Sequence, residues 1–171
     1  MTALFPAGEA LPPVIFDTVG GSPVKVGGAS DRWTLFVVYR GKHCGRCNPY
    51  LSKLESMKAA WEDAGFDIVA VSADTAAKAQ ADVAEYGWTF PVGYGLTEDQ
   101  MRAYGLYVSA PLSEGETDRN FAEPGVYCLR PDGTALLIAV SNGPSARPDL
   151  DQLLDGMIFT IKNDRPPRGT A

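Results

Sequence analysis

The sequence predicts an α/β fold in which helices flank a central mixed β-sheet. Residues 35–39 are continuously apolar and rich in β-branched and aromatic side chains, which is typical of a strand buried on both faces. Apolar residues then recur at helical spacing as far as Gly65, and a second apolar run covers 68–71. This order implies a right-handed crossover and parallel pairing. A later hairpin over 126–140 adds antiparallel strands, so we expect a mixed sheet.

The segments before and after this unit complete the first half of the chain. Residues 1–13 lack periodicity and are expected to form an irregular lead-in. The strands 14–16 and 23–26 flank Gly20-Gly21, which predicts a β-hairpin ahead of the main sheet. A helix is expected over 76–86, capped by Asp74 or Thr75 and ended by Gly87. The residues of this helix expected to face the sheet are Ala77, Ala81, Val83 and Ala84.

The second half is less regular until its hairpin. Residues 90–94 predict a short strand and 98–104 a short helix, whereas 105–123 is the least periodic stretch. We expect 105–123 to be a variable insertion beside the active site. After the hairpin, 149–161 predicts an amphipathic helix. The whole chain, 1–171, is expected to form one domain, with 1–30 as an N-terminal extension.

Composition narrows the function classes. The chain has 171 residues, 45% hydrophobic residues and a net charge of −6, and no basic face is apparent, so no nucleic-acid partner is expected. No segment resembles a secretory signal or is long enough to span a membrane, so we expect a cytoplasmic protein with no membrane partner. Structural disulfides are rare in that compartment. The three cysteines, two of them in one Cys-x-x-Cys, therefore indicate a redox pair and one further thiol.

Cys44 and Cys47 lie where the first buried strand gives way to a helix N-terminus. A helix N-terminus stabilises negative charge, and the thiolate is the reactive form of cysteine. Cys44 precedes the first helical turn and is expected to be the more exposed thiol. Positive neighbours should lower the thiol pKa further. These neighbours are Arg40, Lys42, Arg46 and, when protonated, His43, and Arg40 is best placed to act because it ends the buried strand.

A zinc site and inert buried thiols are the alternatives to redox chemistry at this pair. Structural zinc needs about four ligands, and Cys-x-x-Cys supplies only two. His43 adjoins Cys44 and is poorly placed to complete such a site. Redox chemistry is therefore favoured, and neither a metal nor another cofactor is expected.

The string Tyr39-Arg40-Gly41-x-x-Cys44-x-x-Cys47 resembles the peroxiredoxin-like branch of the alkyl hydroperoxide reductase/thiol-specific antioxidant (AhpC/TSA, redoxin) family of the thioredoxin-like superfamily. The resemblance runs from about residue 35 to the C-terminus. It implies a thioredoxin-like fold with an N-terminal β-hairpin extension and an antioxidant thiol oxidoreductase that reduces hydroperoxides. A dithiol reductant such as a thioredoxin or glutathione system would restore the enzyme, and a homodimer is compatible with the family.

The resemblance leaves the order of attack open. By analogy with thioredoxin, Cys44 attacks first. Peroxiredoxins carry Pro-x-x-x-Thr/Ser-x-x-Cys, and aligning this pattern on Cys47 places Arg40 and Cys44 at the proline and threonine positions. Aligning it on Cys44 places Val37 and Gly41 there.

The resemblance also implies supporting residues. A thioredoxin-type fold would place Pro124, with a cis peptide bond, opposite the cysteine pair. The residues themselves leave two interpretations open for each neighbour of the pair: Arg40 stabilises the thiolate or binds peroxide, or is a solvated charge at the strand end, and His43 tunes the thiol or is simply exposed. Arg119 and Arg130 lie near the position of the peroxiredoxin catalytic arginine, and neither is assigned that role. Cys128, in the apolar strand, is expected to be a core thiol, since a resolving role would need that strand to open.

Two other functions remain open. The first is a general thiol–disulfide oxidoreductase without significant peroxidase activity. The second is a non-catalytic binding module of thioredoxin fold that uses 105–123 as its contact surface.

Overall fold

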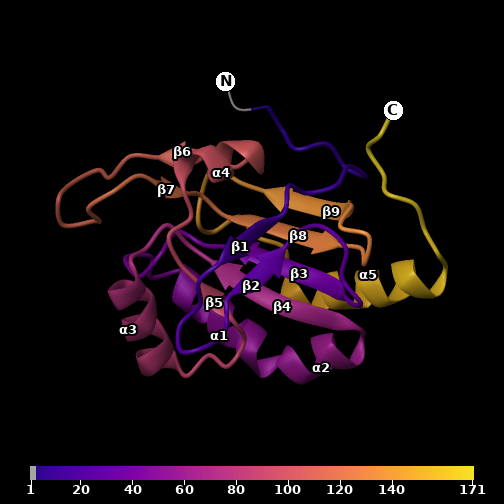
Figure 1. The fold of residues 1–171 in the computed structure, drawn as a ribbon, viewed down its shortest axis with the longest axis horizontal. Helices are drawn as coiled ribbons and strands as arrows, with labels where there is room; N and C mark the ends of the chain where they lie inside the picture. Colours follow the sequence, from indigo (N-terminus) through magenta and orange to yellow (C-terminus); the bar gives the residue numbers. More distant parts are fainter. Residues whose placement is uncertain (1–2) are drawn as a thin grey trace.

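The structure is a computed structural model, and it describes residues 3–171 (Figure 1). Its centre is a five-stranded sheet. In spatial order the strands are β5 (Val92–Gly93), β4 (Phe66–Val71), β3 (Trp33–Val38), β8 (Gly125–Leu129) and β9 (Ala135–Val140). Strands β3, β4 and β5 are parallel, whereas β8 is antiparallel to both β3 and β9. The predicted mixed α/β sheet is confirmed.

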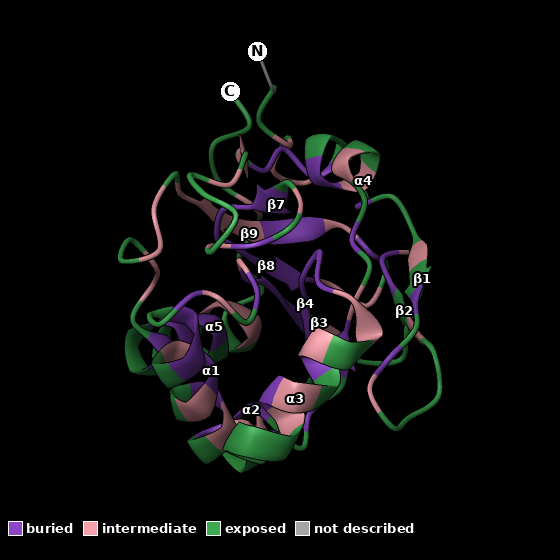
Figure 2. Ribbon diagram, turned by 90° about the vertical axis from the view of Figure 1, so that its left-hand side faces the viewer, coloured by how far each residue is buried: buried purple, intermediate pink, exposed green. Residues whose placement is uncertain are grey.

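Different elements cover the two faces of the sheet. One face carries α1 (Cys47–Ser56), α2 (Lys58–Asp63), α3 (Ala76–Tyr86) and α5 (Leu150–Lys162). The other carries the hairpin β1 (Val14–Phe16)–β2 (Val24–Val26), α4 (Glu98–Ala103) and the pair β6 (Val108–Ser109)–β7 (Phe121–Ala122). Figure 2 shows the strands between these layers in the colour of buried residues. Strand alternation divides β3 accordingly, with Leu35 and Val37 toward the helices and Phe36 and Val38 toward the other core.

The helix that follows the cysteine pair is divided in two, whereas its spacing predicts one continuous helix. Met57 leaves helical geometry with φ −102° and ψ 1°, and its N–H donates to the carbonyls of both Lys53 and Leu54. The chain tightens at this point and restarts as α2. Trp61 of α2 then packs edge-on against Phe66 of β4, with ring centroids 5.0 Å apart.

Helix α3 begins and ends as predicted but buries a different face. The Thr75 side chain caps it by accepting from Lys78 N–H, and Gly87 ends it in the left-handed region at φ +69°. The buried residues are Ala79 and Asp82, while two expected core residues, Ala77 and Ala84, are exposed. An alanine-rich helix gives little hydrophobic contrast between its faces, so its rotation could not be inferred from the sequence.

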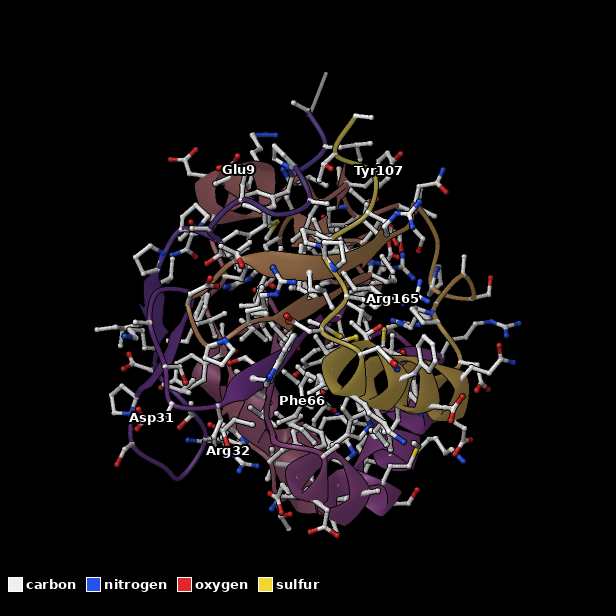
Figure 3. The ribbon with its side chains drawn as sticks, turned by 90° about the vertical axis from the view of Figure 1, so that its right-hand side faces the viewer. Glu9, Asp31, Arg32, Phe66, Tyr107 and Arg165 are labelled. Atoms are coloured by element: carbon white, nitrogen blue, oxygen red, sulfur yellow. The ribbon has the colours of Figure 1, made fainter. Side chains whose placement is uncertain are left out.

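The ends of the sheet differ in character. Where β3 and β4 begin, the Arg32 guanidinium donates to the Asp67 carboxylate at 3.0 Å and to the carbonyls of Glu62 and Phe66 (Figure 3). These bonds tie the two strand starts together, and the cysteine pair lies at the opposite end. None of the helices within residues 3–171 has the length and apolar character needed to cross a membrane.

Candidate active site

Three separate chain segments converge at the end of the sheet where β3 finishes. The register pairs Val38, the last residue of β3, with Gly125, the first residue of β8. Gly125 in turn pairs with Val140, the last residue of β9. Three parts of the chain therefore meet at this end of the sheet: the turn after β3, the residue before β8 and the loop after β9. The residues brought together there are 39–46, Pro124 and 141–149.

The turn after β3 is held by a buried carboxylate. Gly41 has φ +124°, and a Cβ there would lie 2.7 Å from Asp74 Oδ1, so only glycine fits. Asp74 Oδ2 accepts a hydrogen bond from Lys42 N–H at 2.7 Å. Cys44 N–H then donates to the Gly41 carbonyl at 3.0 Å. Asp74, one of the two expected caps of α3, therefore supports the cysteine turn instead.

The two cysteines make direct contact at the start of α1. Arg46, at the N-cap position, provides no side-chain hydrogen bond to the helix. The sulfur of Cys44 takes that place, because Cys47 N–H donates to Cys44 Sγ at 3.2 Å. Cys44 is the more exposed thiol of the two, as expected, but both are buried: the exposed fraction is 3% for Cys44 and 0% for Cys47.

Within the pair, the pKa values of the two thiols are shifted in opposite directions. The S–H of Cys47 donates to Cys44 Sγ and, with backbone N–H groups of Arg46 and Cys47, lowers the pKa of Cys44 to about 5 despite its burial. The same hydrogen bond and burial raise the pKa of Cys47 well above its ordinary value. These opposite shifts favour a thiolate at Cys44 and a protonated thiol at Cys47.

Arg147 is the cation of this pair, and no local sequence pattern indicates it. Its Nη2 lies 2.6 Å from Cys47 Sγ, and its charge lowers the pKa of both thiols. The guanidinium is fixed by the Pro144 carbonyl, which accepts from Nη1, and by the ring of Tyr50, whose centroid is 5.1 Å from Cζ. One feature of the predicted sheet does point to Arg147: the loop after β9 leaves the sheet at the same end as the cysteine turn.

Arg40, by contrast, forms ion pairs with two carboxylates of the segment 105–123. Its guanidinium lies 3.2 Å from Glu116 Oε1 and 3.3 Å from Glu123 Oε2, and it stacks 4.7 Å above the Phe121 ring. Two negative partners compensate its positive charge. His43 packs edge-on against the same ring at 4.6 Å, and burial, followed by the charge of Arg40, lowers the pKa of its imidazole.

Comparisons with known proteins identify the family of the chain. The profile of the AhpC/TSA family matches residues 7–136, which is more than half of the chain. The chain belongs to the AhpC/TSA family. Membership supports a thiol-peroxidase-like function. A comparison with curated proteins gave no sequence match.

Several solved structures have a similar fold over almost the whole length of this AhpC/TSA chain. A peroxiredoxin-like protein from Aquifex aeolicus superposes with a TM-score of 0.76 at 16% identity, covering 91% of this chain and 87% of that one. Peroxidoxin BcpB from Mycobacterium tuberculosis gives 0.71 at 13% identity, covering 94% and 98%. AhpC from Mycobacterium bovis gives 0.73 at 14% identity, covering 99% of each chain. These similarities establish the thioredoxin-like fold.

Pro124 differs from the expectation for this fold. It is buried directly before β8, at the edge where the cysteine turn lies, but no peptide bond within residues 3–171 is cis. The prediction of a cis bond is therefore wrong. The trans form is the lower in energy by roughly 0.5–1 kcal/mol for X-Pro bonds. Hydrogen bonds on either side hold the backbone extended, from Glu123 N–H to the Tyr107 carbonyl and from Ser141 N–H to the Pro124 carbonyl.

The remaining candidate residues lie away from the AhpC/TSA cysteine pair or deep in the core. Cys128 is fully buried in β8 opposite Leu35, and burial raises its pKa to about 12. Arg119 is paired with Asp118, and Arg130 donates to the Arg165 carbonyl. Within residues 3–171, no three His, Cys, Asp or Glu side chains are grouped as metal ligands.

Proposed function

We propose that this protein is a thiol peroxidase in which Cys44 attacks the hydroperoxide and Cys47 resolves the product. The proposal rests on the contact between the two sulfurs, in which the S–H of Cys47 and its backbone N–H hold Cys44 as a thiolate. A thiolate is the nucleophile that peroxide oxidation requires. Arg147 supports the same charge from the other side of the pair.

The reaction balances with these groups and one proton taken from solvent. The Cys44 thiolate attacks one peroxide oxygen, the O–O bond breaks, and the departing alkoxide takes a proton to leave as alcohol or water. Cys44 is now a sulfenic acid. Cys47 loses its proton to the departing hydroxide and attacks the Cys44 sulfur, which forms the disulfide and releases water. A dithiol then supplies two electrons and two protons; one proton returns to Cys47 and the other to solvent, which leaves Cys44 as the thiolate.

A second candidate is a general thiol–disulfide oxidoreductase, and the state of Arg40 favours it. A cation that binds peroxide must be free to meet it, whereas Arg40 is held by Glu116 and Glu123. A contacting pair with one low pKa is equally suited to attack a disulfide. For either activity we place the protein in the cytoplasm, where dithiol reductants keep thiols reduced.

Stopped-flow kinetics separate the two candidates. The reduced protein is mixed with hydrogen peroxide and, separately, with a small aromatic disulfide, and loss of the Cys44 thiolate is followed. We expect a second-order reaction with peroxide that Cys44→Ser abolishes. Cys128→Ser is the matched control and should react like wild type, because that thiol is buried and protonated. Rapid reaction with the disulfide and none with peroxide would establish the second candidate instead.

A further inference from the structure

A cavity lies between strand β9, helix α5 and the segment 163–171 that follows the helix. Its volume is about 550 Å³, within the range of roughly 300–1,000 Å³ found for small-molecule sites. Strand β9 lines it with residues 136–138, whereas Val140, the last residue of β9, lies at the end of the sheet where the cysteine turn is found. Neither cysteine of the pair lines the cavity, which is therefore a separate site.

Most of the cavity lining is apolar. Leu136 of β9 and Leu153 and Met157 of α5 all line it, and all three belong to the core between the helix and the sheet. Phe159 lines it too and is 52% exposed. Apolar surface that is open to water favours a ligand with a hydrocarbon part, because covering it releases water.

Gly156 keeps the helical wall of the cavity open. It lies in the interior of α5 and lines the cavity, and a Cβ built on it would meet nothing within 4 Å. Its φ is not positive, so the backbone does not require glycine there. Glycine is among the least favourable residues in a helix interior. The helix thus carries a weakening residue at a position where any side chain would project into or beside the cavity.

The end of α5 fixes the position of Arg165. Asp164 has φ +45°, its N–H donates to the Ile161 carbonyl, and Arg165 N–H donates to the Thr160 carbonyl, which together form a Schellman turn. The Arg165 guanidinium then stacks on the Phe159 ring, with Cζ 5.1 Å from the ring centroid. Figure 3 shows the chain turning away from the end of α5 at Arg165. Stacking leaves the edge of a guanidinium available for hydrogen bonds.

The cavity carries positive charge without an acidic counterpart, although the protein has a net charge of −6. Arg165 and Arg168 both line it, and no Asp or Glu does. Neither arginine forms an ion pair with a carboxylate in the part of the chain that the structure describes. Guanidinium groups bind carboxylates through paired hydrogen bonds, so this side of the cavity is suited to an organic acid.

We propose that this cavity binds a linear aliphatic carboxylate, with its hydrocarbon chain against β9 and α5 and its carboxylate on Arg165 and Arg168. A small hydrophilic anion would leave the apolar lining in water, and a neutral hydrocarbon would leave both guanidinium groups without a partner. An amphipathic acid satisfies both parts of the lining. The site goes beyond the proposed redox function, because it neither contains nor requires the cysteine pair.

Calorimetric titration of the whole chain tests the ligand class. The ligands are octanoate, decanoate and 1-octanol, each below its micelle or solubility limit. Each buried methylene raises affinity about fourfold, so decanoate should bind about tenfold more tightly than octanoate. The neutral 1-octanol has the same chain length as octanoate and should bind at least about tenfold more weakly, because it makes no charge-assisted hydrogen bond.

Variants test the two parts of the lining separately. Gly156→Leu should fold, because its Cβ enters open space and leucine favours a helix, and it should lose decanoate binding. Arg168→Ala, at an exposed position, should weaken decanoate about tenfold and leave 1-octanol within about twofold. Arg102→Ala removes an exposed arginine of α4 and is the control for net charge, so it should bind decanoate like wild type.

Amide NMR spectra locate the ligand, and decanoate should shift residues 136–138 and 153–168. Absence of decanoate binding, or binding that neither Gly156→Leu nor Arg168→Ala weakens, would overturn the proposal. A second copy of the chain is the other occupant that this face could take, because β9 is an edge strand of the sheet. Sedimentation velocity at the same concentration identifies it: a dimer that excludes decanoate would refute the ligand site and assign the face to self-association.

Discussion

At the scale of single residues, the two thiols of the pair have different chemical roles because their pKa values are shifted in opposite directions. Cys44 receives hydrogen bonds from Cys47, while Cys47 is held protonated by burial and by the same contact. Sequence position distinguishes the two only by order, with Cys44 ahead of the first helical turn. The contact between the sulfurs is what makes them different.

The pKa of Cys44 can be measured by thiolate absorbance at 240 nm. Wild type should titrate with a midpoint near 5, far below the free value of about 8.5. Arg147→Gln should raise that midpoint by about one unit, whereas Arg40→Gln should change it much less, because Glu116 and Glu123 already compensate Arg40. Chain position favours Arg40 among the basic residues of the turn and does not consider Arg147. A larger shift in Arg40→Gln than in Arg147→Gln would contradict the assignment.

Asp82 gives a second residue-scale prediction. Neither of its carboxylate oxygens accepts a hydrogen bond, it is fully buried, and burial raises its pKa to about 6. A carboxyl whose folded pKa lies above the unfolded value of about 3.9 destabilises the fold as pH rises through 4 to 6. Asp82→Asn should therefore raise the free energy of unfolding by about 2 kcal/mol at pH 8, with the gain disappearing below pH 4. Urea denaturation at both pH values measures it.

The exposed Asp155 on α5 provides the control. Asp155→Asn should leave stability nearly unchanged at both pH values. If Asp82→Asn were instead destabilising at pH 8, the pairing of Asp82 with Lys42 at 3.7 Å would have to outweigh the burial of its charge.

At the scale of elements, the turn between β3 and α1 depends on Gly41. Gly41→Ala forces a Cβ against the Asp74 carboxylate in a left-handed conformation, so we expect a loss of about 2 kcal/mol in unfolding free energy and at least tenfold slower peroxide reaction. Gly45→Ala, in the same turn but with open space around it, is the matched control and should fold like wild type. Equal stability of the two variants in urea would show that Asp74 does not constrain the turn.

The elements that could be predicted are those with strong local patterns. The apolar runs predict β3 and β4, and Thr75 and Gly87 predict the ends of α3. The break at Met57 and the burial of Asp82 depend on packing against the sheet, which the spacing of apolar residues does not encode. Arg147 lies 100 residues from Cys47 and is recognisable only once the strand order is known. Glu116 and Glu123 lie in a segment without periodicity, so their pairing with Arg40 left no sequence signal.

At the scale of the whole molecule, the fold stabilises the reduced state. The depressed pKa of Cys44 means that the thiolate stabilises the folded reduced chain fully above about pH 8.5, and that this contribution is lost as pH falls toward 5. The disulfide form has no thiolate and gains nothing from it. The protein should therefore be a stronger oxidant than thioredoxin.

Equilibration of the protein with a redox buffer measures the reduction potential of the Cys44–Cys47 disulfide. The reduction potential at pH 7 should be more positive than about −270 mV, the value of thioredoxin. Between pH 6 and 8 it should fall by about 30 mV per pH unit, because reduction takes up one proton for two electrons when Cys44 is ionised. A slope of about 59 mV per unit across this range would mean that both thiols are protonated.

The assignment of Cys44 as the attacking thiol has its most direct test in trapping the sulfenic acid. Cys47→Ser and Cys44→Ser proteins are treated with one equivalent of hydrogen peroxide in the presence of dimedone, and the adduct is located by peptide mass spectrometry. The expected result is a dimedone adduct on Cys44 in the Cys47→Ser protein and none on Cys47 in the Cys44→Ser protein. An adduct on Cys47 with Cys44 unmodified would contradict the account, because Cys47 would then be the nucleophile and Cys44 the resolving thiol.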